Sequence, residues 1–245
     1  MKSPQQNSAK VITQVNQKEF PQELCEPDDL MWTLGTREKF YGFLAQSFSS
    51  EPNLEFLSEL GAQIDIFRKN PLFKKGADLL YAFFEEAGTQ LNEKQGDLAR
   101  EFVFLFLAPG VHRVHPYESV HRSKKRLFKQ EPYDQVVHAL RGSGLGKREG
   151  CKELEDHIAL ELEYMEILCG DTLRAFWEND RKKAHELLER QRLFLVKHLL
   201  RWVPGFCRRV YKEARSKFYQ GIALITEAFI SSERDRIGKL NMSLD

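Results

Sequence analysis

Residues 153–165 have the sequence ELEDHIALELEYM, and this stretch decides which fold the chain is expected to adopt. Its apolar side chains at positions 154, 158, 162 and 165 recur every three or four residues, which places them on one face of an α-helix. Glu153, His157 and Glu161 form a second stripe at i, i+4 spacing. The pattern predicts a long helix from about Glu153 to Trp177, whose acidic first turn opposes the positive end of the helix dipole.

Helical periodicity continues on both sides of this stretch. Further helices are expected at about 28–52, 54–70, 77–91, 92–107, 180–201, 204–215 and 217–236. The run FVFLFL at 102–107 is apolar on every side, so it is expected in the centre of the core. No stretch alternates apolar and polar residues as a half-buried strand does. The sequence therefore predicts an all-α protein, a single helical-bundle domain of roughly ten helices.

The middle of the chain departs from this helical pattern. Residues 108–122 mix Pro and Gly with polar residues, which indicates a loop, and 123–141 is expected to be a helical segment broken at Pro132. The glycine-rich segment 142–150 is expected to be a flexible linker that acts as a hinge. The predicted organisation is a flexible N-terminal tail at 1–27, an N-terminal helical half at 28–107, a loop and hinge at 108–150, and a C-terminal helical half at 151–245.

Composition narrows the classes of protein that this chain can be. It has 245 residues, of which 42% are hydrophobic and 30% charged, which is typical of a soluble globular protein. The formal net charge of +1 provides no global field for nucleic acid or for an anionic membrane. The N-terminal residues lack the apolar segment of a secretory signal, and no run is apolar enough to span a bilayer. We therefore expect a cytoplasmic protein with no stable membrane insertion and no nucleic-acid partner.

One function that the sequence allows is that of a metal-dependent helical-bundle enzyme, because His157 and Glu161 have the spacing of metal ligands on one helix. The position three residues before His157 is Leu154, however, so this helix lacks the Glu-x-x-His motif of di-metal carboxylate bundles. Glu118 and His121 have that spacing but no counterpart, and the histidines at 112, 115 and 121 lack a completing set of ligands. We therefore expect that the protein binds no metal ion and no cofactor.

A phosphate-binding loop is weighed at 142–148, which has the sequence GSGLGKR. The motif requires four residues between its glycines and a Ser or Thr after the lysine, and this segment has neither. The segment therefore favours a linker, and a nucleotide-dependent activity has no phosphate loop to support it.

Three motifs, in this order along the chain, resemble those of one known family. They are PYESVH at 116–121, the ELEDH stretch at 153–157 with the apolar helix that follows, and HLLRWVPGF at 198–206. Together they resemble the TorD/DmsD/NarJ family of redox-enzyme maturation chaperones. Two positions depart from the family pattern: Leu154 stands where the family often has Pro, and His121 stands where an aromatic residue is common.

The resemblance implies an all-α, cytoplasmic protein of the TorD-like type that is a chaperone and not an enzyme. Members of the family bind the apo-form of a molybdenum-containing catalytic subunit. Many also bind its twin-arginine signal peptide and hold back export until the cofactor is inserted. The resemblance further implies a monomer, or a dimer that exchanges halves through 142–150.

The resemblance also implies a binding site for the client or its signal peptide. Its expected residues are Tyr117, Glu118, Ser119, Glu153, Asp156 and His157. Carboxylates in this set can accept the guanidinium groups of a twin-arginine peptide, and an aromatic-lined groove can take the apolar stretch that follows. His157 is expected to orient Asp156 or to donate a hydrogen bond itself, and its protonation near neutral pH can tune binding.

Overall fold

The computed structural model describes residues 10–12, 30–110 and 113–242, and it confirms the all-α prediction. Its helices are α1 (Leu30–Ser49), α2 (Leu54–Lys69), α3 (Lys74–Ala87), α4 (Leu91–Phe102), α5 (Glu118–Arg122), α6 (Glu131–Gly142), α7 (Ile158–Trp177), α8 (Arg181–Phe194), α9 (Leu200–Glu213) and α10 (Lys217–Met242). A 3₁₀ turn, η1 (Gly88–Gln90), precedes α4, and two π-helical turns, η2 (Val103–Leu107) and η3 (Leu195–Leu199), follow α4 and α8.

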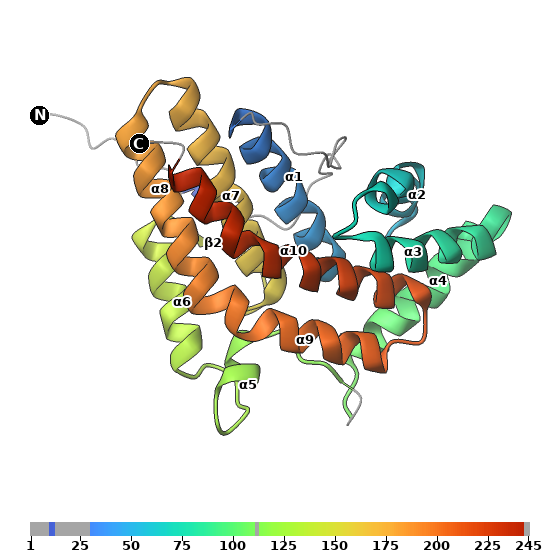
Figure 1. Ribbon diagram of the computed structural model, residues 1–245. Helices are drawn as coiled ribbons and strands as arrows, with labels where there is room; N and C mark the ends of the chain where they lie inside the picture. The colour runs from blue at the N-terminus through green and yellow to red at the C-terminus, as the bar shows by residue number, and fades with distance from the viewer. Residues whose placement is uncertain (1–9, 13–29, 111–112, 243–245) are drawn as a thin grey trace, which may run out of the picture.

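The helices are arranged along one elongated body (Figure 1). α6, α7 and α8 lie toward one end, α2, α3 and α4 lie toward the other, and α9 and α10 run between the two ends. α7 packs most closely against α1 and α8, whereas α10 packs against α9 and α3. None of the helices within the described ranges is long and apolar enough to cross a membrane.

Stacked aromatic rings join elements that are far apart in the sequence. Phe40 of α1 stacks on Phe229 of α10 with ring centroids 4.3 Å apart, and on Phe73 with centroids 4.9 Å apart. Phe106 of η2 stacks on Phe206 of α9 at 6.1 Å. Burying each such ring contributes about 1.5–3 kcal/mol. One core therefore contains residues of both predicted helical halves. The boundaries drawn between those halves stay a prediction.

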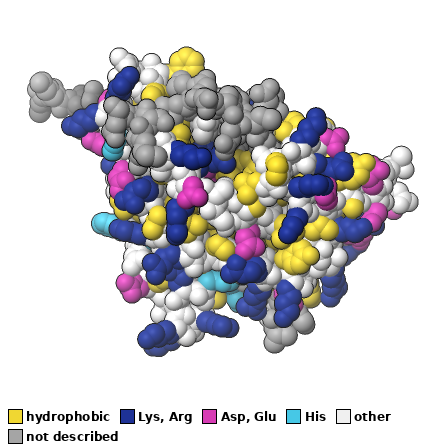
Figure 2. Space-filling model, in the orientation of Figure 1, with side chains coloured by type: hydrophobic (Ala, Val, Ile, Leu, Met, Phe, Trp, Pro, Cys, Tyr) yellow, Lys and Arg dark blue, Asp and Glu magenta, His cyan; other side chains and the backbone are white. Residues whose placement is uncertain are grey.

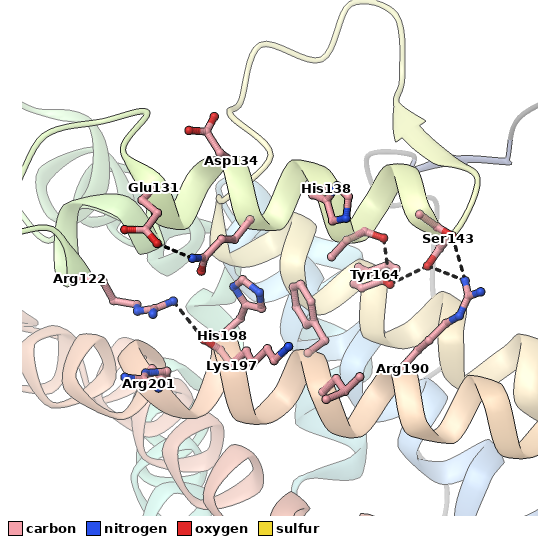
Figure 3. Close-up of a pocket in the computed structure, with 15 residues that line it drawn as sticks. Arg122, Glu131, Asp134, His138, Ser143, Tyr164, Arg190, Lys197, His198 and Arg201 are labelled. Atoms are coloured by element: carbon pink, nitrogen blue, oxygen red, sulfur yellow. Dashed lines mark hydrogen bonds between the residues drawn. The ribbon is translucent and has the colours of Figure 1, made fainter.

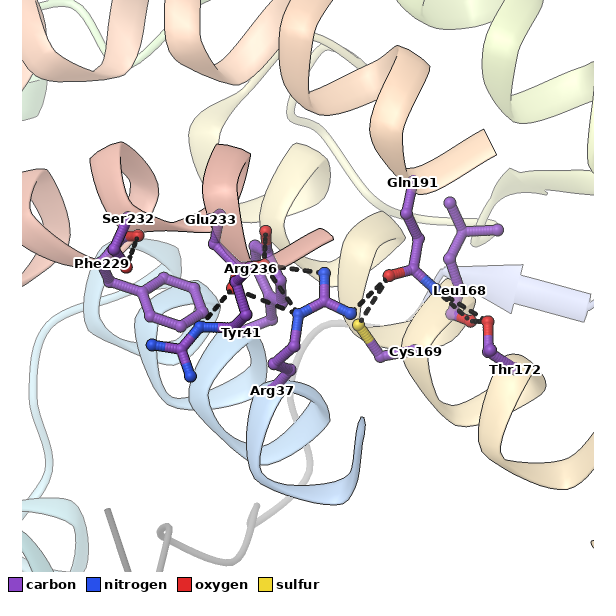
Figure 4. Close-up of polar contacts among 10 residues, drawn as sticks. All are labelled: Arg37, Tyr41, Leu168, Cys169, Thr172, Gln191, Phe229, Ser232, Glu233 and Arg236. Carbon is purple, nitrogen blue, oxygen red and sulfur yellow. Dashed lines mark hydrogen bonds and ion pairs between the residues drawn. The ribbon is translucent and has the colours of Figure 1, made fainter. Parts of the chain in front are cut away.

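A buried polar network ties α1, α7, α8 and α10 together (Figure 4). Arg37 is 1% exposed, and its Nε and Nη2 donate to Oε2 of Glu233 at 2.9 and 2.7 Å. Tyr41 donates to the same oxygen, and Nη1 of Arg37 donates to Gln191 at 2.8 Å. Gln191 in turn donates to the hydroxyl of Thr172. Because buried charges are costly unless they are paired and hydrogen-bonded, this satisfied network fixes how the four helices meet.

Three predicted element boundaries were wrong. α7 begins at Ile158 and not at Glu153, so Glu153 is outside the helix and the predicted stripe of three side chains does not form. Pro132 does not break α6 but stands in its first turn, where proline removes no intrahelical hydrogen bond. Pro204 lies inside α9, and the separate helices predicted at 180–201 and 204–215 run on through η3 without an intervening loop.

The run at 102–107 lies only partly in the core. Leu105 and Phe106 are buried, but Val103 is 38% exposed and Leu107 is 50% exposed. The run ends α4 and forms η2, and only one side of it meets the other helices. The prediction that the whole run lies in the centre of the core was therefore wrong.

The segment predicted as a flexible linker contains a short strand. β2 (Leu145–Lys147) pairs in parallel with β1 (Lys10–Ile12), and Leu145 is buried. Apart from β1, the predicted tail at 1–27 lies outside the described residues. Exchange of halves through 142–150 stays a prediction.

Candidate functional site

The loop motif and the acidic motif lie against each other, although about forty residues separate them in the sequence. Tyr117 and His157 form an isolated antiparallel bridge. The amide of Glu118 donates to the carbonyl of Asp156 at 2.9 Å, and the amide of Ile158 donates to the carbonyl of Pro116 at 2.9 Å. This backbone pairing explains why α7 starts at Ile158: His157 before it is extended and paired with the loop, and the preceding residues form a turn closed by a hydrogen bond from the amide of His157 to the carbonyl of Leu154.

Asp156 holds the start of α5. Its side chain is fully buried, and Oδ2 accepts a hydrogen bond of 2.8 Å from the amide of Ser119, the second residue of α5. An acceptor at this position satisfies one of the free amides at a helix N-terminus. Burial raises the pKa of Asp156, with hydrogen bonds from Ser119 acting in the opposite direction. The structure therefore places Asp156 where it supports the loop and is shielded from solvent.

His157 caps α7. Its Nδ1 accepts a hydrogen bond of 3.2 Å from the amide of Ala159, and its ring packs edge-on against Tyr117 with centroids 5.0 Å apart. Burial lowers the pKa of His157 to about 4. The side chain is therefore neutral at pH 7, and the expectation that its protonation tunes binding near neutral pH was wrong. The physical reason is that a buried imidazole which accepts a hydrogen bond cannot gain a proton cheaply.

Tyr117 and Glu153 are the two predicted site residues that reach the surface in part. The Tyr117 hydroxyl donates to the Glu153 carboxylate, and both side chains are half-buried. Burial and the Glu153 carboxylate raise the pKa of Tyr117. The other four predicted residues, Glu118, Ser119, Asp156 and His157, are buried.

Glu118 is the predicted residue with the most ionic contacts. Its side chain is fully buried. Oε2 lies 2.8 Å from Nδ1 of His198, and Oε1 is paired with Nη1 of Arg122. Glu161 lies close by and accepts a hydrogen bond of 3.0 Å from the indole of Trp202. Burial, followed by the charge of Glu118, raises the pKa of Glu161 well above its usual value, so the neutral form of Glu161 is favoured.

A groove of about 930 Å³ lies beside Glu118, and Figure 3 shows it in close-up. One wall is α6, and the opposite wall is formed by α8, η3 and the start of α9. The α6 wall carries Glu131 and Asp134, whereas the opposite wall carries Arg190, Lys197 and Arg201. Between the walls the groove has an apolar floor.

The floor of the groove is built from α7 and α8. Tyr164 and Phe194 contact each other edge-on with centroids 4.7 Å apart, and Leu193 also lines the groove. The Tyr164 hydroxyl is 2.7 Å from the hydroxyl of Ser143 at one end of the groove. Arg122 and His198, the two partners of Glu118, line the other part. Glu118 therefore lies directly behind two side chains that face the groove.

Charge on the outside of the molecule is mixed. Over the face drawn in Figure 2, acidic and basic side chains are interspersed, and Lys and Arg gather toward its lower edge, where α5 and α9 lie in Figure 1. A groove with one acidic and one basic wall suits a ligand that carries charges of both signs or orients its cations toward one side.

The sequence suggested an aromatic-lined groove but did not indicate its position, its charged walls or several residues around Glu118. Arg122 was placed in a loop, although its i, i+4 spacing from Glu118 is the signal of a helical ion pair. His198 and Trp202 belonged to the third motif, but nothing in their spacing showed that they face Glu118 and Glu161. No sequence motif indicated that Glu131 and Asp134 of α6 form an acidic wall.

The residues proposed for a metal site have other partners. His157 uses Nδ1 to cap α7, and Glu161 is bonded to Trp202. In the part of the chain that the structure describes, no group of three or more His, Cys, Asp or Glu side chains is placed to hold a metal ion. Residue 112, one of the three loop histidines, lies outside the described residues.

Comparison with known proteins gives consistent matches. Residues 70–208, more than half of the chain, match the model of a family described as nitrate reductase delta subunit. The chain is 26% identical over 207 residues to the chaperone protein TorD of Vibrio vulnificus strain CMCP6, which covers 81% of this chain and 93% of that protein. It is 24% identical over 208 residues to TorD of Vibrio cholerae strain N16961, covering 83% and 93%.

A third relative matches over a shorter range. The chaperone protein TorD of Photobacterium profundum is 28% identical over 137 residues, which is 56% of this chain and 62% of that protein. The range matched by the family model contains all three sequence motifs and both walls of the groove.

Proposed function

This chain belongs to the TorD/NarJ-like family of redox-enzyme maturation chaperones, and from that membership we propose that it binds the apo-form of a molybdenum-containing oxidoreductase, the twin-arginine signal peptide of that enzyme, or both. The family is one of chaperones and not of enzymes. In the proposed role the protein acts in the cytoplasm. It holds the catalytic subunit there and assists insertion of the cofactor before export or assembly.

The position of Glu118 behind the groove is the observation that supports this proposal most. A twin-arginine peptide presents two guanidinium groups followed by an apolar stretch. The groove offers acceptors for the first part, Glu131 and Asp134 on its rim and Glu118 behind it, and the apolar floor offers a surface for the second. Guanidinium–carboxylate contacts give both affinity and geometric specificity, and an apolar floor adds area burial.

The six predicted site residues divide into two roles in this proposal. Glu118, with Tyr117 and Glu153 at the partly exposed edge, supplies contacts to the client. Ser119, Asp156 and His157 are positioning residues: the Ser119–Asp156 hydrogen bond fixes α5, and His157 fixes the start of α7. This division follows from the hydrogen-bond partners: Arg122 and His198, the two partners of Glu118, line the groove, whereas Ser119 and Ala159, the partners of Asp156 and His157, do not.

Isothermal titration of a synthetic twin-arginine signal peptide tests the proposal. The peptide is taken from a molybdoenzyme catalytic subunit of the same organism, and its matched control has both arginines replaced by lysine. We expect binding by the arginine peptide and about tenfold weaker binding by the lysine peptide, the equivalent of losing one charged hydrogen bond. If the folded protein binds neither the peptide nor the apo-subunit, the proposed function is wrong.

A further inference from the structure

Arg122 stands between the groove and Oε1 of Glu118. It is the last residue of α5, four residues after Glu118, and it lines the groove. Its Nη1 pairs with Oε1 of Glu118 and also donates to the carbonyl of Lys197 at 3.0 Å. The Arg122 side chain is 19% exposed, whereas that of Glu118 is fully buried. A guanidinium therefore already occupies the acceptor pair formed by the Glu118 carboxylate and the Lys197 carbonyl.

The contact of Arg122 uses only one of its nitrogens. Both hydrogen bonds come from Nη1, and within the described residues Nε and Nη2 form none. The buried pair of Arg37 and Glu233 shows the contrast, because there Nε and Nη2 both reach the carboxylate and Nη1 binds Gln191. A single-nitrogen contact has less geometric specificity than a bidentate one and is easier to displace.

Glu118 has contacts other than the one with Arg122. Its Oε2 is held by Nδ1 of His198 at 2.8 Å, and its backbone amide is bonded to Asp156. Leaving a buried carboxylate without its cation is costly, but exchanging one guanidinium for another preserves the charge balance. Arg122 lies at the end of a five-residue helix next to an exposed turn, so its side chain can move out to solvent without disturbing the core.

We propose that Arg122 is a stand-in for the client: it occupies the subsite that receives one arginine of the client peptide, and the incoming guanidinium replaces it at Glu118. This inference rests on the proposed function and adds a specificity-determining residue to it. The ligand class is an arginine-bearing peptide segment, because the subsite consists of one carboxylate and one carbonyl, both acceptors, in a position shielded from water. Arg122 then keeps the Glu118 carboxylate paired until a client binds. A ligand that binds too weakly to displace Arg122 does not occupy this subsite.

Removal of Arg122 is therefore expected to tighten binding. The apparent affinity of a peptide that must displace an intramolecular competitor is its intrinsic affinity multiplied by the fraction of molecules in which the subsite is open. If Arg122 occupies the subsite about 80–90% of the time, Arg122→Gln is expected to bind the peptide about five- to tenfold more tightly. Arg122→Met, which keeps the aliphatic stem, is expected to give the same gain. Arg192→Gln is the matched control, because it removes one charge and one Arg–Glu pair of α8 outside the groove.

A double-mutant cycle with Glu118→Gln completes the test by titration with the arginine peptide. We expect Glu118→Gln to weaken binding and to abolish the gain from Arg122→Gln, since the two residues then no longer compete for the same contact. Thermal melts confirm that each variant folds. Equal affinities of the wild type, Arg122→Gln and Arg122→Met would overturn the inference while the proposed function stands. A gain that persists beside Glu118→Gln would overturn it as well. Failure of the wild type to bind peptide or apo-subunit would overturn the proposed function, and this inference with it.

Discussion

Trp202 of α9 donates its indole N–H to the carboxyl group of Glu161 on α7 at 3.0 Å, and both side chains are buried. This bond joins the third sequence motif to the helix that follows the second. Together with the contact between His198 and Glu118, it brings segments from 116–121, 153–165 and 198–206 to one place. Three stretches that are separated along the chain therefore support a single site beside the groove.

Replacing Trp202 with Phe tests the energetic importance of that bond. The ring contacts with His121 and Phe206 are largely kept, but the polar partner of Glu161 is lost inside the protein. We expect the free energy of unfolding to fall by about 1–3 kcal/mol, measured by urea denaturation, because a buried acceptor loses its donor. Trp177→Phe is the control, since Trp177 is 75% exposed and should change stability by no more than about 0.5 kcal/mol. Equal effects of the two changes would contradict this account.

The pKa of His157 predicts a pH dependence of stability. Because burial lowers its pKa from 6.5 to about 4 in the folded state, the unfolded chain binds a proton first as the pH falls. The contribution of His157 is therefore fully present above pH 6.5 and is lost between pH 6.5 and about 4, with a total of about 3 kcal/mol.

His157→Asn isolates this contribution. Asn keeps an oxygen that can cap α7 but does not titrate. We expect the free energy of unfolding of the variant to depend less steeply on pH than that of the wild type between pH 6.5 and 4, by chemical denaturation at several pH values. Parallel pH profiles for the two proteins would show that His157 does not become protonated on unfolding in this range.

Helical periodicity predicted most of the fold because the apolar faces of the helices meet one another in the core. The second helix was expected at 54–70, and α2 spans Leu54–Lys69. The start of α7 was missed for a specific reason. Acidic residues favour the first turn of a helix, but they also suit the turn before it, and the competing backbone pairing with Pro116 comes from a distant segment that periodicity does not reveal.

The site was predicted at the level of segments and not at the level of side chains. The order of the motifs indicated which stretches matter, but it did not show that Asp156 and Glu118 are buried or that Arg122 faces the groove. Burial depends on how α5, α7 and α9 meet in three dimensions. Charge type and local spacing therefore suggested that Asp156 contacts the client directly. The structure shows instead that Asp156 caps the start of α5.

Asp156 allows positioning to be distinguished from direct contact. Asp156→Ala removes the acceptor for the Ser119 amide and is expected to cost about 0.5–2 kcal/mol of stability and to weaken peptide binding, because α5 loosens. Asp156→Asn keeps an acceptor oxygen without the charge. If Asp156 acts by positioning α5, the Asn variant retains most of the affinity in titration calorimetry, and the Ser119 amide stays protected from hydrogen exchange. A loss of affinity in Asp156→Asn as large as in Asp156→Ala, with Ser119 still protected, would instead make Asp156 a direct contact.

The network around Arg37 is expected to be the most sensitive polar feature of the core. Glu233 is fully buried and receives Arg37 and Tyr41, so Glu233→Gln leaves the guanidinium of Arg37 without its counter-charge inside the protein. Breaking one partner of a buried ion pair costs about 3–5 kcal/mol, whereas replacing both partners by apolar residues of similar volume costs much less.

We therefore expect strong non-additivity in this network. Glu233→Met and Arg37→Met should each lower the free energy of unfolding by about 3–5 kcal/mol, and the double variant that combines these two substitutions should lower it by clearly less than the sum. The exposed pair of Arg192 and Glu189 provides the comparison, because Arg192→Gln should cost at most about 1 kcal/mol. Urea denaturation of the single and double variants measures all of these values. Additive losses would mean that Arg37 and Glu233 stabilise the protein independently, through contacts other than the one they share.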